Sequence, residues 1–438
     1  MEALGAAALV FGLLVLALGA GLWVFVALLA VAIAALHVGL GFPMDRIGAI
    51  AKGVLWRASS GWELAAIPMF VFMGELIFRT DLSARLFAGL EPLVARVPGR
   101  LYHTNVLGCT LFAAVSGSST ATTATVGRMT TAALGERGYD PRLAVGSLAG
   151  AGSLGLLIPP SIMLIVYGVL AEVSITQLFA AGLLPGLMVA GLYAAYIAVA
   201  CLARPSLAPA EPARRRRRVA ETARLVLRGL GPVALLIVVV LGGIYSGIAT
   251  PSEAAAVGVA ATLALTAALG QLTRRLFAEA LMSALKASCM IATLLTAAAL
   301  LSTAMGYMHV PATIAQAIGA MGLGPYALIA LLALFYILLG FFLDGVSIVV
   351  MTLPITLPLA LQAGFDPVWY GVFLVLMVEL GLMTPPVGFN LFVLKAVTGR
   401  PLGMIARAAV PFFLLMLLAT AILTVFPGIA LWLPGQLG

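Results

Sequence analysis

Residues 138–161 read GYDPRLAVGSLAGAGSLGLLIPPS, and residues 364–387 read GFDPVWYGVFLVLMVELGLMTPPV. Nine of the 24 aligned positions are identical without a gap, and the constant offset that aligns them carries Pro159 onto Pro385. Both segments carry the pattern Gly-x-x-x-Pro-Pro inside an apolar run, and a proline pair interrupts a helix by removing backbone donors. Matching breaks in the two halves of an apolar chain are the sequence pattern of a binding site in a membrane transporter.

The composition excludes a soluble protein. Of the 438 residues, 63% are hydrophobic and 9% are charged, whereas a soluble domain carries about 25% charged residues. Apolar runs long enough to cross a membrane fill nearly the whole chain. The sequence therefore predicts an all-α polytopic membrane protein, with no aqueous catalytic domain. The basic residues behind the net charge of +8 lie in short loops, so no nucleic-acid partner is expected.

Two segments differ from ordinary crossing helices. Residues 101–135 and 325–361 each hold two short apolar stretches around a polar tip, SGSST at 116–120 and DGVS at 344–347. Such a tip is tolerated at membrane depth only where protein or a cavity surrounds it, so each segment predicts a re-entrant helical hairpin. Full crossings are predicted over 3–20, 22–40, 62–80, 142–170, 177–203, 229–248, 252–270, 288–307, 368–396 and 409–431.

The charge distribution predicts an inverted repeat. The loop 204–228 contains Arg214 to Arg218 in a row and is expected to be cytoplasmic. Five crossings in each half then give the halves opposite orientations and place the N-terminus outside, on the side away from the cytoplasm. The basic segment 41–61 disagrees with this count and is predicted to be an interfacial helix. The chain divides into the first repeat 1–203, with hairpin 101–135 and broken helix 142–170; the cytoplasmic loop 204–228; and the second repeat 229–438, with hairpin 325–361 and broken helix 368–396.

The tips and breaks predict a cation site. A proline break frees backbone carbonyls, which suit a desolvated Na⁺. Asp344, an acidic residue between apolar runs, is a functional hypothesis by default and also a possible helix cap. Hydroxyl and carbonyl oxygens without a carboxylate cluster favour a monovalent cation, and no other metal or cofactor is expected. The predicted Na⁺ ligands are Ser116, Gly117, Ser118, Gly155, Pro159, Asp344, Gly345, Gly381 and Thr384.

The same elements predict the substrate contacts. A half-helix that restarts after a break presents N–H groups and a positive dipole end, which suit a carboxylate. The predicted substrate contacts are Ser119, Thr120, Ser161, Gly388 and Asn390. Thr122, Thr123 and Thr125 are assigned mainly to packing. Glu75 and Glu379 remain open between substrate, coupling and inter-helix roles, and Glu253 is predicted to complete a capping box with Thr250.

The chain resembles the large membrane subunit of TRAP transporters (tripartite ATP-independent periplasmic transporters, DctM type). The stretches that carry the resemblance are IPMFVFMGEL at 67–76, LFAAVSGSSTATTATVG at 111–127, the segment 138–168, GIYSGIATPSEAAAVGV at 243–259 and GLMTPPVGFNLFVLK at 381–395. The resemblance implies an inverted-repeat elevator in the bacterial inner membrane, with Na⁺ near both hairpin tips. It also implies an organic acid delivered by a periplasmic substrate-binding protein, and a small four-helix membrane subunit as a separate chain among the membrane lipids.

Two alternatives come from other classes. One is a stand-alone ion-coupled carboxylate carrier of related fold that needs no binding protein. The other is an intramembrane hydrolase using Asp344 or a tip serine, but no histidine lies near the tips and a non-enzymatic function is expected. The chain also has no GxxxxGK phosphate loop, which argues against an ATP-driven pump. A C4-dicarboxylate, a sugar acid and a keto acid are all open as substrates.

Overall fold

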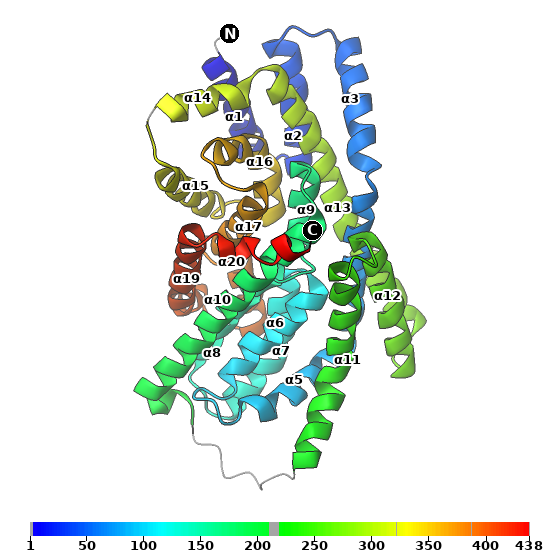
Figure 1. Cartoon of the computed structure of the whole chain (residues 1–438), viewed down its shortest axis with the longest axis vertical. Coiled ribbons are helices and arrows are strands. Elements are labelled where there is room, and N and C mark those ends of the chain that lie inside the picture. The colour runs from blue at the N-terminus through cyan, green and yellow to red at the C-terminus, as the bar shows by residue number, and fades with distance from the viewer. Residues whose placement is uncertain (1–2, 210–218, 321, 387, 438) are drawn as a thin grey trace.

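The computed structural model describes residues 3–209, 219–320, 322–386 and 388–437 (Figure 1), and every regular element in these ranges is a helix. Arg214 to Arg218, on which the predicted orientation rests, lie outside the described residues. The helices of the first half are α1 (Ala3–Gly19), α2 (Val24–Ala34, continued by a π turn to Gly39), α3 (Met44–Ser59), α4 (Ala66–Phe78), α5 (Leu82–Val94), α6 (Tyr102–Ser116), α7 (Ser119–Glu136), α8 (Pro141–Gly152), α9 (Ile162–Ala171) and α10 (Ile175–Ala203).

The second half repeats this order of helices. Its members are α11 (Val219–Tyr245), α12 (Pro251–Ala268), α13 (Arg274–Tyr307), α14 (Val310–Ala320), α15 (Pro325–Leu339), α16 (Gly345–Gln362), α17 (Pro367–Leu382), α18 (Phe389–Thr398), α19 (Leu402–Val425) and α20 (Gly428–Leu431). Short 3₁₀ turns lie at Trp62–Ala65, Ser153–Leu156, Pro205–Leu207 and Pro434–Gln436.

Helix boundaries recur at the offset found in the sequence. The offset that aligns Pro159 with Pro385 also carries both ends of α7 (Ser119–Glu136) onto both ends of α16 (Gly345–Gln362). It carries the start of α8 onto the start of α17 as well. The internal repeat therefore extends well beyond the two matching sequence segments. One element differs: α4 and the 3₁₀ turn before it meet α3 at an angle of 51°, where the second half has the single helix α13.

The shared Asp-Pro dipeptide explains where the two broken helices begin. The Asp140 carboxylate accepts hydrogen bonds from the backbone N–H groups of Arg142 and Leu143, both at 2.9 Å. Asp366 caps α17 in the same way, through Val368 N at 2.7 Å and Trp369 N at 3.1 Å. Proline at the first helical position loses no hydrogen bond and has the φ that a helix requires.

The number of long helices is smaller than the predicted number of crossings. Six described helices are long and apolar enough to cross a membrane, or seven if the bent pair α3–α4 forms one span: α10, α11, α12, α13, α16 and α19. Shorter apolar helices include both arms of the two broken spans except α8, together with α1, α2 and α15. The all-helical, polytopic class is confirmed, while the ten crossings and the re-entrant character of the hairpins stay predictions.

Several boundaries differ from the prediction. Segments 81–100 and 308–324, which lie between the predicted crossings and hairpins and were expected to be loops, contain α5 and α14. α11 begins at Val219 and not at 229, and α13 begins at Arg274 and not at 288. The physical reason is that a helix can extend beyond its apolar stretch through a segment with charged side chains. The prediction placed the helix boundary at the end of the apolar stretch. The last predicted span, 409–431, is divided between α19 and α20.

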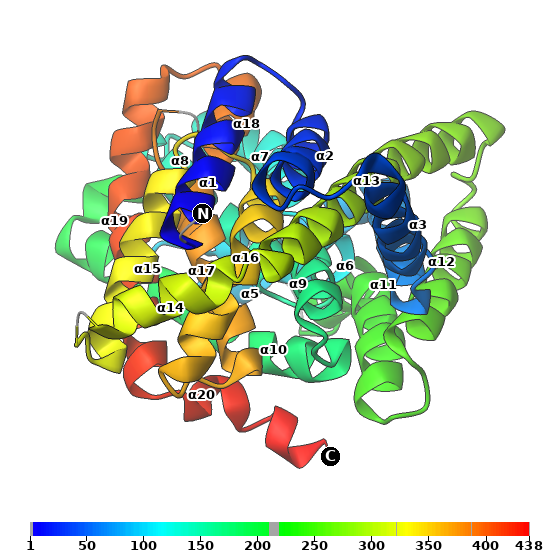
Figure 2. The ribbon, with the colours of Figure 1, turned by 90° about the horizontal axis from the view of Figure 1, so that it is seen from above.

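The helices form two neighbouring groups. α3, α11, α12 and α13 lie together along one side of the molecule in both views, with α15 and α19 on the opposite side (Figures 1 and 2). α4 packs against α12 and α13 and joins the first group to the hairpin helix α6. The hairpins α6–α7 and α15–α16 and both broken helices belong to the second group, which we call the hairpin unit.

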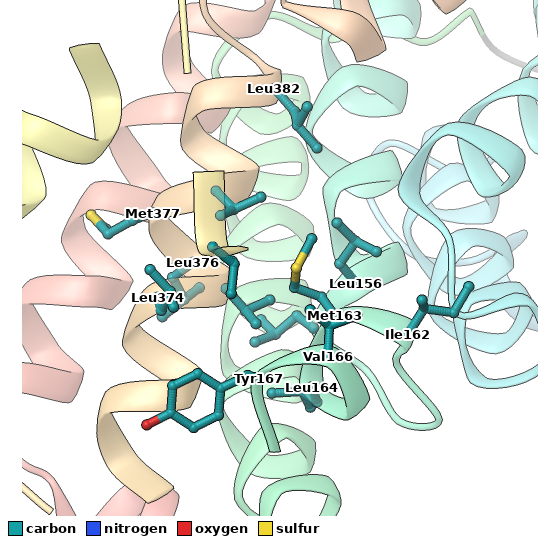
Figure 3. Close-up of a cluster of buried hydrophobic side chains, with 14 of the residues drawn as sticks. Leu156, Ile162, Met163, Leu164, Val166, Tyr167, Leu374, Leu376, Met377 and Leu382 are labelled. Atoms are coloured by element: carbon teal, nitrogen blue, oxygen red, sulfur yellow. The ribbon is translucent and has the colours of Figure 1, made fainter. Parts of the chain in front are cut away.

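The two halves interlock within the hairpin unit. α9, which follows the first break, packs against α16 of the second hairpin, and α18, which follows the second break, packs against α7 of the first hairpin. Buried side chains of α9 and α17, among them Met163, Tyr167 and Leu374, lie together in the core (Figure 3). Each half-helix is therefore held in place by the hairpin of the other half.

Candidate functional site

Both hairpin tips line one cavity of about 510 Å³. α4 contributes Gly74, Glu75 and Phe78 to its wall, and α13 contributes Met290 and Ile291. Half of the predicted ligand residues line this cavity, and they come from both repeats: Ser116, Gly117, Ser118, Ser119, Thr120, Asp344 and Gly345. The fold thus brings together two polar tips that lie in opposite halves of the sequence.

The remaining predicted residues lie in and beside the breaks, outside the described lining of this cavity: Gly155, Pro159, Ser161, Gly381, Thr384, Gly388 and Asn390. Gly155 packs directly under the first tip, since a Cβ at this position would lie 2.5 Å from Ser119 Cα and 2.6 Å from Ser118 O. Gly381 makes a similarly close approach to Gly340 at the end of α15, where its Cβ would lie 2.7 Å from Gly340 Cα. In each half, the glycine in the break therefore allows the backbone of the same half's hairpin to approach closely.

The first tip is a cluster of hydroxyl and backbone oxygens. Gly117 ends α6 in the left-handed region, at φ +60°, and its carbonyl accepts a hydrogen bond from Ile162 N at 3.4 Å. The Ser116 and Thr122 hydroxyls lie 2.9 Å apart. The Ser118 hydroxyl caps α7 by accepting from Ala121 N at 3.4 Å. Thr122, assigned from the sequence to packing, is buried and holds the Ser116 hydroxyl in place.

The first break is ordered by its own serine. Ser161 Oγ donates to Leu156 O and accepts from Leu164 N at 3.3 Å, which caps α9. Its side chain is fully buried. The Pro159–Pro160 peptide bond is cis, as is the Pro385–Pro386 bond of the second break.

Asp344 acts as a helix cap and also lines the cavity. Its carboxylate accepts hydrogen bonds from Val346 N at 3.1 Å and Ser347 N at 3.2 Å, and from Ser347 Oγ at 2.5 Å. The sequence left open whether Asp344 is a helix cap, a functional residue or both. Its position is compatible with both roles. In the second break, the Thr384 hydroxyl donates to Leu380 O at 2.5 Å, in the last turn of α17.

The charges around the cavity are acidic. Glu75 and Asp344 line it, and its described lining contains no Lys, Arg or His side chain. Glu75 forms an ion pair with Arg79 at 3.1 Å, and Arg79 also reaches Glu279 on α13 at 2.9 Å. Among the residues that the structure describes, no group of three or more His, Cys, Asp or Glu side chains lies close enough to hold a metal ion.

Glu379 connects the second broken helix to the first tip. Its side chain is 0% exposed; Oε2 lies 3.0 Å from Ser119 Oγ, and Oε1 accepts from Leu156 N at 3.2 Å. Asn390 Nδ2 donates to the same Ser119 Oγ at 2.7 Å. The sequence left the role of Glu379 open, and the structure shows the inter-helix contact. Ser119 and Asn390, predicted as substrate contacts, use their side chains in this network.

A model of the family "Tripartite ATP-independent periplasmic transporter, DctM component" matches residues 9–429 of the chain. The chain is 37% identical over 387 residues to the C4-dicarboxylate TRAP transporter large permease protein DctM of Pseudomonas aeruginosa, covering 88% of this chain and 89% of that protein. It is 31% identical over 426 residues to the isethionate TRAP transporter permease protein DctMQ of Oleidesulfovibrio alaskensis, covering 97% of this chain and 66% of that protein.

Among solved structures, the YdaH transporter of Alcanivorax borkumensis has a similar fold. The TM-score is 0.60 at 17% sequence identity, covering 86% of this chain and 88% of that chain. At this identity the likeness supports the fold alone.

Proposed function

Since this chain belongs to the family of large permease subunits of TRAP transporters, the DctM components, we propose that it couples the inward movement of Na⁺ to uptake of an organic acid. The observation that carries this proposal is the shared cavity, in which the tips of both hairpins meet. Membrane transport by a permease follows from the family. The ion, the substrate class and the mechanism are what we add.

The acidic lining of the cavity supports cation coupling. A carboxylate substrate entering the cavity meets Asp344 and Glu75, of which Glu75 is ion-paired with Arg79, and no basic side chain in the described lining. Like charges repel more strongly beside the largely apolar walls of this cavity than in bulk water. Cations bound at the two tips would offset that repulsion, so anion binding would depend on prior cation binding. This dependence is what a symporter needs.

We assign one Na⁺ to each tip, with the ligands predicted from the sequence. At the first tip the Ser116 and Ser118 hydroxyls and the backbone of Gly117 and Gly155 form the site. At the second tip Asp344 supplies the charge, because its carboxylate lines the cavity while it caps α16. Thr384 and Gly381 border this second site from the break.

The substrate would bind between the tips. Thr120 lines the cavity, and the Ser119 hydroxyl borders it. Ser161, Gly388 and Asn390 lie in and beside the breaks, where they would hold the half-helices in position. Two relatives are named for the anions C4-dicarboxylate and isethionate, which supports an organic anion without choosing one.

Alternating access would follow an elevator mechanism. The hairpin unit would move as a body against the group formed by α3, α4, α11, α12 and α13. α4, α9, α13 and α16 meet at the boundary between the two groups, where such sliding would take place. Tips that close only over bound ions would prevent movement of a partly loaded carrier.

We further propose that the subunit works with a periplasmic substrate-binding protein and a small four-helix membrane subunit encoded as a separate chain. The assembly would lie in the bacterial inner membrane among its lipids, with the N-terminus in the periplasm and the loop 204–228 in the cytoplasm. The alternative of a stand-alone carrier is tested by omitting the binding protein, since uptake at an unchanged rate would favour it.

The test is uptake into proteoliposomes that contain the reconstituted partners. We expect accumulation to require an inward Na⁺ gradient, and accumulation without that gradient would reject the sodium assignment. Ser118→Ala and Asp344→Ala should each raise the Na⁺ concentration needed for half-maximal uptake, while both proteins still insert into the membrane.

Asp366→Ala is the matched control for Asp344→Ala. Each substitution removes a carboxylate that caps a helix through two backbone N–H groups, at a cost of about 1 kcal/mol. Only Asp344 lines the cavity. A change in Na⁺ dependence that is equal in the two variants would assign the effect of Asp344 to helix capping.

A further inference from the structure

Two adjoining cavities lie apart from the hairpin tips, where α3, α9, α13 and α16 meet (Figures 1 and 2). The first has a volume of about 370 Å³, with walls from α3, α9, α13 and α16. The second, of about 510 Å³, lies between the end of α9 and the starts of α10 and α12. The two cavities share Val169 and Glu172. None of the predicted ion or substrate ligands belongs to the described lining of either cavity.

Most of the wall of the first cavity is apolar. Aliphatic side chains reach it from all four helices and from the turn before α4, and the largest are Val54, Leu64, Leu170, Leu295, Leu353 and Leu357. Contact between such a wall and water is unfavourable, whereas contact with a hydrocarbon chain is favourable. In a polytopic membrane protein, the acyl chains of lipids supply that contact.

One basic and one acidic side chain interrupt this apolar wall. Arg57 comes from the last turn of α3, and Glu172 follows the last residue of α9. Neither forms an ion pair within the described ranges. The Ser302 hydroxyl on α13 also lines this cavity. A bound group with a negative charge beside Arg57 and a positive charge beside Glu172 would complement both side chains.

Glu172 also lines the second cavity, which is more polar. Glu63, the Thr176 hydroxyl and the Trp62 ring lie in the same wall, and its described lining contains no Lys, Arg or His side chain. A primary ammonium has three N–H donors, which carboxylates and hydroxyls accept, and a tryptophan ring attracts a cation over its face. The second cavity therefore suits a cationic group.

The backbone of Glu172 is unusual for its position. Its φ is +55°, a conformation that is unfavourable for a residue with a Cβ. Glycine is the usual residue at such a helix end. The glutamate here places a negative charge at the point where the two cavities join.

We propose that the two cavities form one binding site for a zwitterionic phospholipid with a primary amine, phosphatidylethanolamine. Its acyl chains pack along the apolar wall of the first cavity. Its phosphate accepts hydrogen bonds from Arg57 and Ser302, and its ammonium donates to Glu172 and Glu63. Phosphatidylglycerol has no cation for the second cavity, and phosphatidylcholine has no N–H donor, so each lacks part of this match.

The place of the site in the fold gives the lipid a structural role. On the predicted orientation, the turns before α10 and α12 lie away from the cytoplasm, so the lipid belongs to the outer leaflet. It contacts α3 and α13 of one group of helices and α9 and α16 of the hairpin unit. A bound lipid therefore stabilises the present arrangement of the two groups.

Native mass spectrometry of the purified full-length protein, stripped of lipid and titrated with one lipid at a time, tests the site. The wild type should bind phosphatidylethanolamine about tenfold more tightly than phosphatidylglycerol or phosphatidylcholine, as expected for one hydrogen bond to a charged group. Arg57→Gln should weaken binding of all three lipids. Glu172→Gln should weaken binding of phosphatidylethanolamine and leave that of phosphatidylglycerol unchanged. Equal wild-type affinity for the three lipids, or wild-type affinity for phosphatidylethanolamine in either variant, would overturn the proposal.

Lys52→Gln and Asp45→Asn are the matched controls, because both residues are exposed on α3 and belong to the described lining of neither cavity. A loss of affinity in Lys52→Gln equal to that in Arg57→Gln would assign binding to surface charge and overturn the site. Ala299→Phe adds a large side chain to the apolar wall and should weaken binding of every phospholipid. Unchanged binding in that variant would show that the acyl chains lie elsewhere.

Two competition experiments distinguish the other possible occupants. Soluble phosphoethanolamine at the concentration of the lipid should not displace it, because the headgroup alone lacks the acyl contacts. Displacement would assign the site to a free small molecule. Phosphatidylethanolamine should also stay bound when the small membrane subunit is added, and its loss would assign the cavities to that subunit.

The melting temperature in detergent gives an independent readout. Phosphatidylethanolamine should raise it in the wild type, because a ligand that binds only the folded state stabilises that state. The increase should be smaller in Arg57→Gln and unchanged in Lys52→Gln. If Arg57→Gln does not fold, Glu172→Gln and Ala299→Phe take its place in both measurements. Equal stabilisation of the wild type by phosphatidylethanolamine and phosphatidylglycerol would contradict the assignment.

Discussion

Gly155→Ala tests whether the first break and the first tip form one ion site. The new Cβ would lie 2.5 Å from Ser119 Cα and 2.6 Å from Ser118 O, whereas an ordinary carbon–carbon contact is about 3.5–4.0 Å. Both clashing atoms belong to the backbone, so no side chain can turn away and the tip must retreat by about 1 Å. Such overpacking costs about 1–3 kcal/mol.

If that cost falls on the ion-bound state, the Na⁺ concentration for half-maximal uptake should rise by about 5- to 150-fold. The assay is a Na⁺ titration of uptake in proteoliposomes, together with a Na⁺ titration of the melting temperature in detergent. Both readings should shift toward higher Na⁺. Half-saturation at the wild-type concentration in both titrations would refute the close packing of break and tip as the basis of the site.

Gly191→Ala is the matched control, because Gly191 lies within α10 and a Cβ there meets no atom within 4 Å. Replacing a helical glycine by alanine should stabilise the protein by about 0.5–1 kcal/mol, with unchanged Na⁺ dependence. A shift in Na⁺ dependence equal to that of Gly155→Ala would assign the effect to the helix backbone in general.

Two further predictions concern residues around the site. Arg79→Gln should raise the KM for an anionic substrate, because Glu75 loses its ion pair at the cavity wall. The increase should be larger at low salt than at high salt. An increase in KM that is the same at both salt concentrations would contradict this prediction. Thr250→Ala should lower the free energy of unfolding by about 1 kcal/mol, because it removes the capping box with Glu253, and it should leave the Na⁺ dependence of uptake unchanged. A melting temperature equal to that of the wild type would show that the cap contributes nothing to stability.

Local sequence determined much of the helix pattern. The starts of α8 and α17 were predictable because Asp-Pro supplies both a cap and a helical φ, and the capping box at Thr250 and Glu253 is confirmed. The turn at Gly117 was predictable because glycine adopts the left-handed region without steric cost. α5 and α14 were missed because each is too short to cross a membrane, at 13 and 11 residues.

The contacts that complete the site were less accessible from the sequence. Glu379 and Ser119 are 260 residues apart, and Asn390 and Ser119 are 271 apart, so no helical period or local motif links them. Asn390 reaches Ser119 because α18 packs against α7, and Glu379 reaches it from α17, which packs against the 3₁₀ turn of the first break. One clue was available: the repeat places Glu379 opposite Ser153, and an acid that replaces a hydroxyl in an apolar helix has to find a partner elsewhere.

The packing of α9 against α16 and of α18 against α7 has a consequence for how the two repeats could have evolved. One repeat alone would leave the half-helix after its break without the hairpin that covers it, so a protein made of a single repeat would need two copies to form this packing. In such a homodimer every substitution would appear on both sides at once. In one polypeptide the two halves can differ, as they do at Ser153 and Glu379, which occupy equivalent positions of the repeat.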